Sequence, residues 1–198
     1  SVGSGITPDI TTEDFAPRVW LCGERVVYDD ATEPGRISAD GEFLEERINN
    51  YAFEGEQVAW EVLVMDKNKI DQGIDVFATV GDSQGEGNDI EVNCDRLTEW
   101  PDDGDDLLKS CNARIGEEQL TQFDADTMEF YRCTLTVETP DSMQDEFWVT
   151  VEAVDADGLS GTMDENEFWF LNPIIALDID GVLTFDGDGD GVRPGATS

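Results

Sequence analysis

The chain has 198 residues, and its 39% hydrophobic content supplies enough apolar mass for one folded core of ordinary domain size. Its 47 acidic residues against 11 basic ones leave a formal charge of −36, which repels phosphate backbones and anionic lipid and so disfavours nucleic-acid and membrane-surface partners. There is no histidine, so Ser-His-Asp triads, Cys-His pairs and histidine metalloprotease motifs are excluded, and we expect no enzymatic activity.

The excess of carboxylates has two competing explanations. Of the 11 basic residues only three are lysines, a composition typical of proteins kept soluble in concentrated salt, where screening removes self-repulsion. Bound divalent cations would relieve the same repulsion.

Because no run approaches the roughly 20 apolar residues of a membrane span, we expect no direct membrane insertion.

The first half of the chain predicts an arm followed by strands. Residues 1–17 are rich in Gly, Thr, Ser and Pro and predict an extended N-terminal arm. Residues 18–28 predict a strand with a kink or bulge at Gly23. In residues 57–65 apolar side chains alternate, and residues 73–81 alternate again after a turn, which predicts a hairpin.

The second half continues with short strands between turn signals. We expect strands at residues 90–94, 131–137, 147–153 and 166–171, and at most a short helix at 117–122. This spacing predicts an all-β fold, an antiparallel β-sandwich over residues 18–172 followed by a C-terminal strand and acidic tail over residues 173–198.

Four stretches carry a resemblance to a known class of module: GEQVAWEVLVMDKN, FYRCTLTVETP, FWVTVEAVDADGL and EFWFLNP. They resemble the immunoglobulin-like modules of large secreted proteins. With the acidic, lysine-poor composition, the chain is similar to uncharacterised surface proteins of archaea, including uncultivated ones. The resemblance implies a surface-exposed, modular, structural protein and carries no characterised activity.

The four cysteines have no CxxC spacing and no histidine to complete a zinc site, so they predict two disulfides and an oxidising, extracellular compartment. Cys94 and Cys111 bracket a short loop without strand periodicity, and closing it removes about 3 kcal/mol of loop entropy from the unfolded chain. We therefore expect Cys94–Cys111, which leaves Cys22 to pair with Cys133.

The acidic tail contains the most specific motif in the chain. Asp186, Asp188 and Asp190 alternate with glycine and predict a calcium loop, to which the Val192 carbonyl adds a ligand. The position of the EF-hand glutamate is Thr197, so the segment resembles the short calcium loops of extracellular repeats, and a solvated acidic linker is the alternative. Weaker cation candidates, for which turn and surface roles are favoured, are Asp155, Asp157 and Asp164, and the cluster of Asp102, Asp103, Asp105 and Asp106.

Aromatic residues late in the chain cannot all belong to the inner face of their strands. Trp148 falls opposite the apolar face of its strand, and Phe168, Trp169 and Phe170 cannot all point inward. An exposed aromatic residue could stack on sugar or fill a neighbour's pocket, but coverage by a loop or by the N-terminal arm is the favoured interpretation.

Two functions follow from these features. The first is a structural subunit of an extracellular filament or surface layer, in which a terminal segment docks on another copy of the chain; the alternative is that this segment folds back on its own sheet. The expected contact residues are Ile175, Leu177, Ile179, Leu183 and Phe185. The second is a monomeric, calcium-dependent adhesion or carbohydrate-binding module whose partners are surface glycans.

Overall fold

The described residues form an all-β fold with one short helix, and the alternation of apolar residues predicts the all-β class. The computed structural model describes residues 13–28, 50–68, 70, 73–85, 88–99, 105–112, 120, 122–163 and 166–174, with the short pairs 184–185 and 191–192. The elements in chain order are β1 Arg18–Tyr28, β2 Tyr51–Ala52, β3 Gln57–Met65, β4 Asp75–Gly81, β5 Ile90–Arg96, α1 Asp105–Asn112, β6 Met128–Thr136, β7 Asp145–Val154, β8 Ser160–Thr162, β9 Glu167–Leu171, β10 Thr184–Phe185 and β11 Gly191–Val192.

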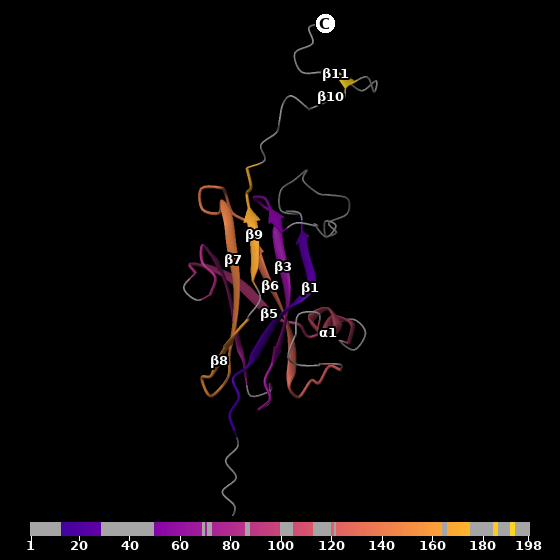
Figure 1. Ribbon diagram of the computed structural model, residues 1–198, viewed down its shortest axis with the longest axis vertical. Coiled ribbons are helices and arrows are strands. Elements are labelled where there is room, and N and C mark those ends of the chain that lie inside the picture. Colours follow the sequence, from indigo (N-terminus) through magenta and orange to yellow (C-terminus); the bar gives the residue numbers. More distant parts are fainter. Residues whose placement is uncertain are drawn as a thin grey trace, which may run out of the picture.

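Nine strands form one curled sheet in the order β1-β3-β6-β5-β4-β7-β9-β2, with β8 paired to β7 (Figure 1). All pairs are antiparallel except β2 with β9, so the sheet is mixed. Strand β5 joins its two halves, because Ile90 to Val92 pair with β4 and Asn93 to Arg96 pair with β6. The halves face each other across a shared core, whereas the immunoglobulin-like type of the fold stays a prediction.

The core is built from the side chains that alternate along the strands. Val58, Trp60, Val62 and Val64 of β3 are all buried in it, as the period of two predicts. Trp60 meets Trp169 of β9 edge to face with ring centroids 5.7 Å apart, which joins the two halves of the sheet. Burial of each such large side chain stabilises the fold by about 1.5 to 3 kcal/mol.

The predicted hairpin between residues 57–65 and 73–81 is wrong. Strand β3 pairs with β1 and β6, whereas β4 pairs with β5 and β7. The connection after β3 bonds to the turn before β6: the Asp66 amide donates to the Thr127 carbonyl at 2.8 Å, and the Ile70 amide to the Asp126 carbonyl at 3.2 Å. Ile70 itself is buried, so the connection carries the chain from one half of the sheet to the other.

The predicted irregularity at Gly23 is confirmed, because the register of β1 against β3 shifts between Leu21 and Arg25. The Gly23 amide donates to the Ser110 hydroxyl at 3.1 Å. A Cβ added at Gly23 would lie 3.3 Å from the Ser110 Cβ, so a larger residue would crowd the helix that packs there.

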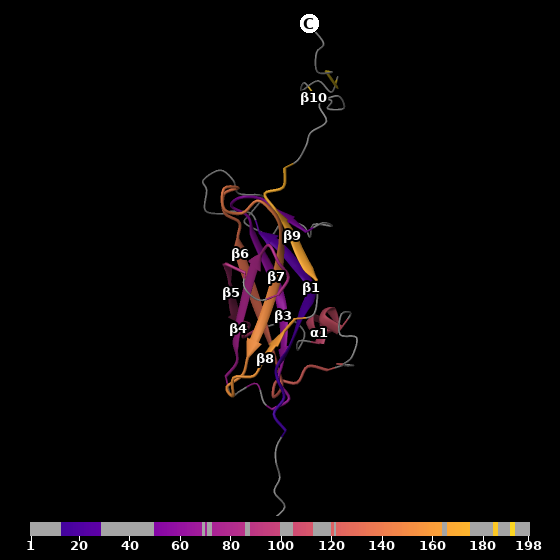
Figure 2. The ribbon, with the colours of Figure 1, turned by 60° about the vertical axis from the view of Figure 1, so that its left-hand side comes forward.

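Helix α1 forms in the segment that leads to Cys111, for which the sequence predicts only a loop, and it packs beside β1 and β3 (Figure 2). Lys109 lies in the last turn of the helix, where a positive charge suits the helix dipole. A helix of eight residues is marginal alone. Tertiary burial of Leu107 and Leu108 therefore stabilises it.

The two edges of the curled sheet approach each other along β1. At one end, β8 lies so close that a Cβ added at Gly161 would be 1.7 Å from the Pro17 carbonyl oxygen. In the middle, Arg25 of β1 pairs with Glu167 of β9 at 3.0 Å. At the other end, β2 covers the edge of β9. The core of the described residues is thus closed along this seam.

Candidate binding surface

The outer faces of the two halves of the sheet differ. Helix α1 covers one of them through a second apolar cluster, formed by Cys22, Leu63, Met65, Leu107, Leu108, Cys111, Met128 and Phe130. The outer face of β7, β9 and β2 instead carries aromatic side chains that remain partly exposed. We call these residues the aromatic row: Trp148, Phe168, Phe170 and Tyr51.

The aromatic row is contiguous across three strands. Trp148 of β7 lies opposite Phe168 of β9 in register, and their ring centroids are 5.5 Å apart. The rings of Phe168 and Phe170 are 5.9 Å apart and perpendicular. Tyr51 of β2 is the register partner of Phe170. Phe168 is 37% exposed and Phe170 is 40% exposed, so the row presents an apolar surface to solvent.

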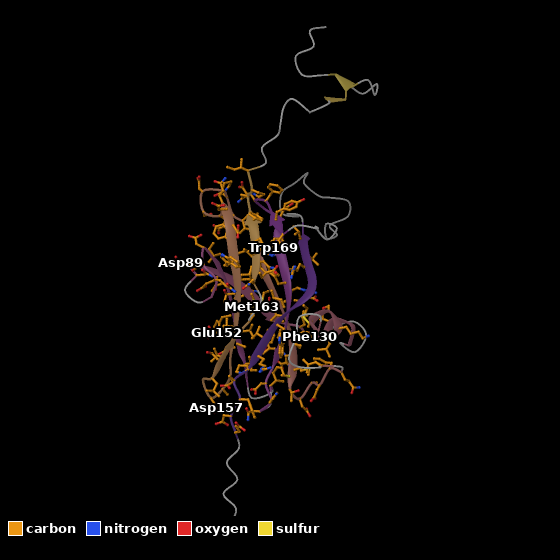
Figure 3. The ribbon with its side chains drawn as sticks, in the orientation of Figure 1. Asp89, Phe130, Glu152, Asp157, Met163 and Trp169 are labelled. Atoms are coloured by element: carbon orange, nitrogen blue, oxygen red, sulfur yellow. A yellow bond between two sulfur atoms is a disulfide. The ribbon has the colours of Figure 1, made fainter. Side chains whose placement is uncertain are left out.

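The strand period places these aromatic residues outward. In β9, burial alternates so that Glu167, Trp169 and Leu171 point inward, and Phe168 and Phe170 therefore point outward. Trp169 lies among the strands of the body (Figure 3). The prediction that the three consecutive aromatic residues cannot all be buried is confirmed, whereas residues 1–12 of the arm that was expected as a possible cover lie outside the described residues.

A buried polar cluster holds β9 beneath the aromatic row. The Glu167 carboxylate pairs with Arg25 at 3.0 Å and accepts hydrogen bonds from Trp169 Nε1 at 2.9 Å and Asn50 Nδ2 at 3.0 Å. Asn50 Nδ2 also donates to the Phe168 carbonyl at 3.0 Å. These contacts fix the backbone that carries the row, so its rings project from a rigid strand.

The loop after β4, residues 82–85, lies beside the aromatic row and exposes polar side chains, so we call it the polar wall. The Gly85 amide donates to the Thr150 hydroxyl at 3.1 Å, and that hydroxyl donates to the Gly85 carbonyl at 3.1 Å. Gln84 Nε2 donates to Asn166 Oδ1, immediately before β9. Since Thr150 lies two residues from Trp148 on the same strand, the wall stands next to the aromatic rings.

A cleft of about 630 Å³ is lined in part by this loop, through Asp82 and Ser83. Its lining includes Asp82, Asn88, Asp141 and Gln144, with Phe147 at its apolar end. The cleft is polar and acidic, in contrast to the aromatic row.

A separate buried network lies on β5 and β6. Burial raises the pKa of Tyr131 well above its usual value of 10, and its hydrogen bond to Glu129 raises it further. The Tyr131 hydroxyl donates to Glu129 Oε2 at 2.9 Å, and Glu129 pairs with Arg96 at 2.5 Å. A tyrosine with a raised pKa stays protonated and so remains a hydrogen-bond donor. Because Arg96 belongs to β5 and both Glu129 and Tyr131 belong to β6, the network joins these two neighbouring strands.

The predicted cation ligands have different outcomes. Residues 186–190 lie outside the described residues, while Val192 lies in β11, which pairs with β10 on either side of that segment. Asp155 has a turn role, because its Oδ1 accepts from the Asp157 amide at 2.9 Å and from the Leu159 amide at 2.8 Å. Within the ranges that the structure describes, no group of three or more acidic or cysteine side chains is arranged to hold a metal ion.

The remaining weak candidates do not form a site in the described ranges. Asp105 and Asp106 begin α1. Asp102, Asp103 and Asp164 lie outside the described residues.

All four cysteines form disulfides, but the predicted pairing is wrong. The bonds are Cys22–Cys111 and Cys94–Cys133. Cys94 and Cys133 are register partners on β5 and β6, and α1 brings Cys111 to the outer side of β1. The loop-entropy argument favoured the shortest loop, whereas strand neighbours decide which sulfur atoms meet. Two disulfides are typical of proteins from an oxidising compartment.

The expected subunit contacts lie mostly beyond the described part of the chain. Ile175, Leu177, Ile179 and Leu183 are outside it, and Phe185 is described only as part of the β10 backbone.

No protein-family model matches the chain, and no curated protein matches it significantly. Among the described residues, no helix has the length and apolar character needed to cross a membrane.

Proposed function

We propose that the chain is a secreted, non-enzymatic structural subunit of an extracellular filament or surface layer, built on an immunoglobulin-like sandwich. Copies of the chain join through their terminal segments. The observation that carries the proposal is the closed seam of the curled sheet, combined with the apolar segment that follows β9.

The segment after β9 carries more apolar surface than a solvated linker needs. Ile174 is 83% exposed where the described chain leaves the sheet. Residues 175–185 then add Ile175, Leu177, Ile179, Val182, Leu183 and Phe185. Because β2, the Arg25–Glu167 pair and β8 already close the seam, this segment finds no missing strand position in the described core.

Docking the segment on another copy is energetically reasonable. Burial of each large apolar side chain contributes about 1.5 to 3 kcal/mol, and ordering each residue costs about 1 to 2 kcal/mol of backbone entropy. When each subunit docks its segment on the next, a head-to-tail contact propagates a fibre or layer.

A variant of unchanged length tests this connection. We expect replacement of Ile175, Leu177, Ile179, Leu183 and Phe185 by threonine to leave the melting temperature of the fold nearly unchanged and to abolish polymers. Negative-stain microscopy and light scattering at high salt measure the assembly. Deletion of residues 186–198 separates the contribution of the acidic tail and its expected calcium ligands from that of the apolar segment. Retention of polymers by the threonine variant, or a monomeric parent chain, would contradict the proposal.

Calcium at Asp186, Asp188 and Asp190, with the Val192 carbonyl, is the expected stabiliser of the tail. We expect chelation at constant ionic strength to lower the melting temperature or to dissociate the assembly, because a ligand that binds only the ordered state stabilises it. Combined replacement of the three aspartates by asparagine is expected to reproduce the effect of the chelator. Identical melting curves and polymer lengths in all conditions would leave the acidic-linker interpretation.

A further inference from the structure

We propose that the aromatic row and the polar wall beside it form a binding site for a neutral oligosaccharide. The site lies on the outer face of β7, β9 and β2. It is independent of the connection between subunits proposed above, so either proposal can fail while the other stands.

The aromatic row can contact a sugar ring. The C–H groups on one face of a pyranose are weakly positive and apolar, and they pack on the negative face of an aromatic ring. Trp148, Phe168 and Phe170 form an unbroken series of rings, and the neighbouring rings are 5.5 and 5.9 Å apart. A series of rings offers several successive sugar units a contact, so the ligand is an oligosaccharide.

The polar side chains at the borders of the aromatic row can hydrogen-bond to sugar hydroxyls. The side-chain amides of Gln84 and Asn166 lie at one border of the row and offer both donors and acceptors. At the other border, exposed Glu146 is the register partner of Phe170, and its carboxylate accepts hydrogen bonds from hydroxyl groups. Aromatic residues combined with a few polar groups are the usual composition of small-molecule sites.

The exposed area of the row favours a small ligand over a protein. A fully buried aromatic side chain covers about 150 to 250 Å². With Phe168 and Phe170 at 37% and 40% exposure and the other two rings half-buried, the row offers about 200 to 300 Å². A stable contact between proteins needs about 800 Å² from each partner.

Charge decides which class of sugar binds. The chain carries a formal charge of −36, and Glu146 lies at the border of the row. Uronic, sialic or sulfated sugars would meet repulsion here, whereas a neutral sugar would not.

The test uses the full chain and three soluble probes. Cellohexaose and maltohexaose are neutral, and a hyaluronan hexasaccharide is the acidic contrast. Calorimetry and tryptophan fluorescence measure association. We expect at least one neutral probe to bind at millimolar concentration and the acidic probe to bind at least about tenfold more weakly, which corresponds to one decade in Kd.

Two matched variants locate the site. The double variant Phe168→Thr and Phe170→Thr removes two rings but retains residues suited to a strand, and we expect it to lower the association constant about tenfold. Phe77→Thr is the control, because Phe77 is 54% exposed on the same outer face but opposite Glu152, outside the row. The single variants Phe168→Thr and Phe170→Thr, each expected to weaken binding several-fold, keep the test valid if the double variant does not fold.

Several outcomes would overturn the proposal. The first is that neither neutral probe binds. The second is that Phe77→Thr lowers the association constant as much as the Phe168→Thr and Phe170→Thr variants do. The third is that the acidic probe binds as tightly as the neutral ones. The proposal would also be overturned if the parent chain bound no sugar and the Phe168→Thr and Phe170→Thr variants lost self-association. The row would then be a contact between copies of the chain.

Discussion

Combined replacement of Cys22 and Cys111 by serine is expected to lower the free energy of unfolding by about 4 to 5 kcal/mol. The bond joins residues separated by 89 positions, and cross-linking so long a loop removes much entropy from the unfolded chain. It is also the covalent connection between α1 and β1, so the helix should loosen locally. Urea denaturation measures the first effect, and hydrogen exchange of the amides in residues 105–112 measures the second.

The other disulfide supplies the matched control. Cys94–Cys133 joins residues separated by 39 positions, so its loss is expected to cost about 4 kcal/mol by the same argument. Because β5 and β6 also pair through their backbones there, the exchange rates in α1 should remain close to those of the parent. Equal loosening of α1 in both variants would contradict the anchoring role of Cys22–Cys111.

Replacement of Glu167 by alanine is expected to destabilise the fold by about 3 to 5 kcal/mol. Its side chain is 5% exposed and that of its partner Arg25 is 19% exposed, so the variant leaves a largely buried guanidinium without this carboxylate. The variant also removes the acceptor for Trp169 Nε1 and for one Asn50 hydrogen bond. Thermal and urea unfolding measure the loss.

Glu61 provides the control for this experiment. It pairs with Arg132 at 2.6 Å, but the Arg132 side chain is 42% exposed and can be rehydrated when the pair is broken. We therefore expect replacement of Glu61 by alanine to cost about 1 kcal/mol or less. If the two variants were equally destabilised, burial of the Arg25–Glu167 pair would not be the cause.

The stability of β9 has a consequence for the surface above it. Glu167 is buried between the two exposed residues Asn166 and Phe168. A variant at Glu167 should therefore weaken the proposed sugar binding indirectly, through the position of the strand. Only variants that change exposed rings and leave the melting temperature unchanged report on the ligand contacts themselves.

The local pattern of the sequence determined the strands and their orientations. Alternation in residues 57–65 predicted the buried face of β3, and Gly23 predicted the irregularity in β1. The three consecutive aromatic residues of β9 predicted that not all three rings point inward, and the structure leaves Phe168 and Phe170 partly exposed. These features depend on the period of two within one strand, which decides the face on which each side chain lies.

Only the tertiary structure decided which strands are neighbours. The turn after β3 resembles a hairpin turn, yet the chain crosses there to the other half of the sheet. The partner of Cys94 is Cys133 because β5 lies beside β6, and α1 forms because Leu107 and Leu108 find an apolar surface on the outer side of the sheet. Such pairings depend on packing between residues distant in the sequence, and no local period encodes them.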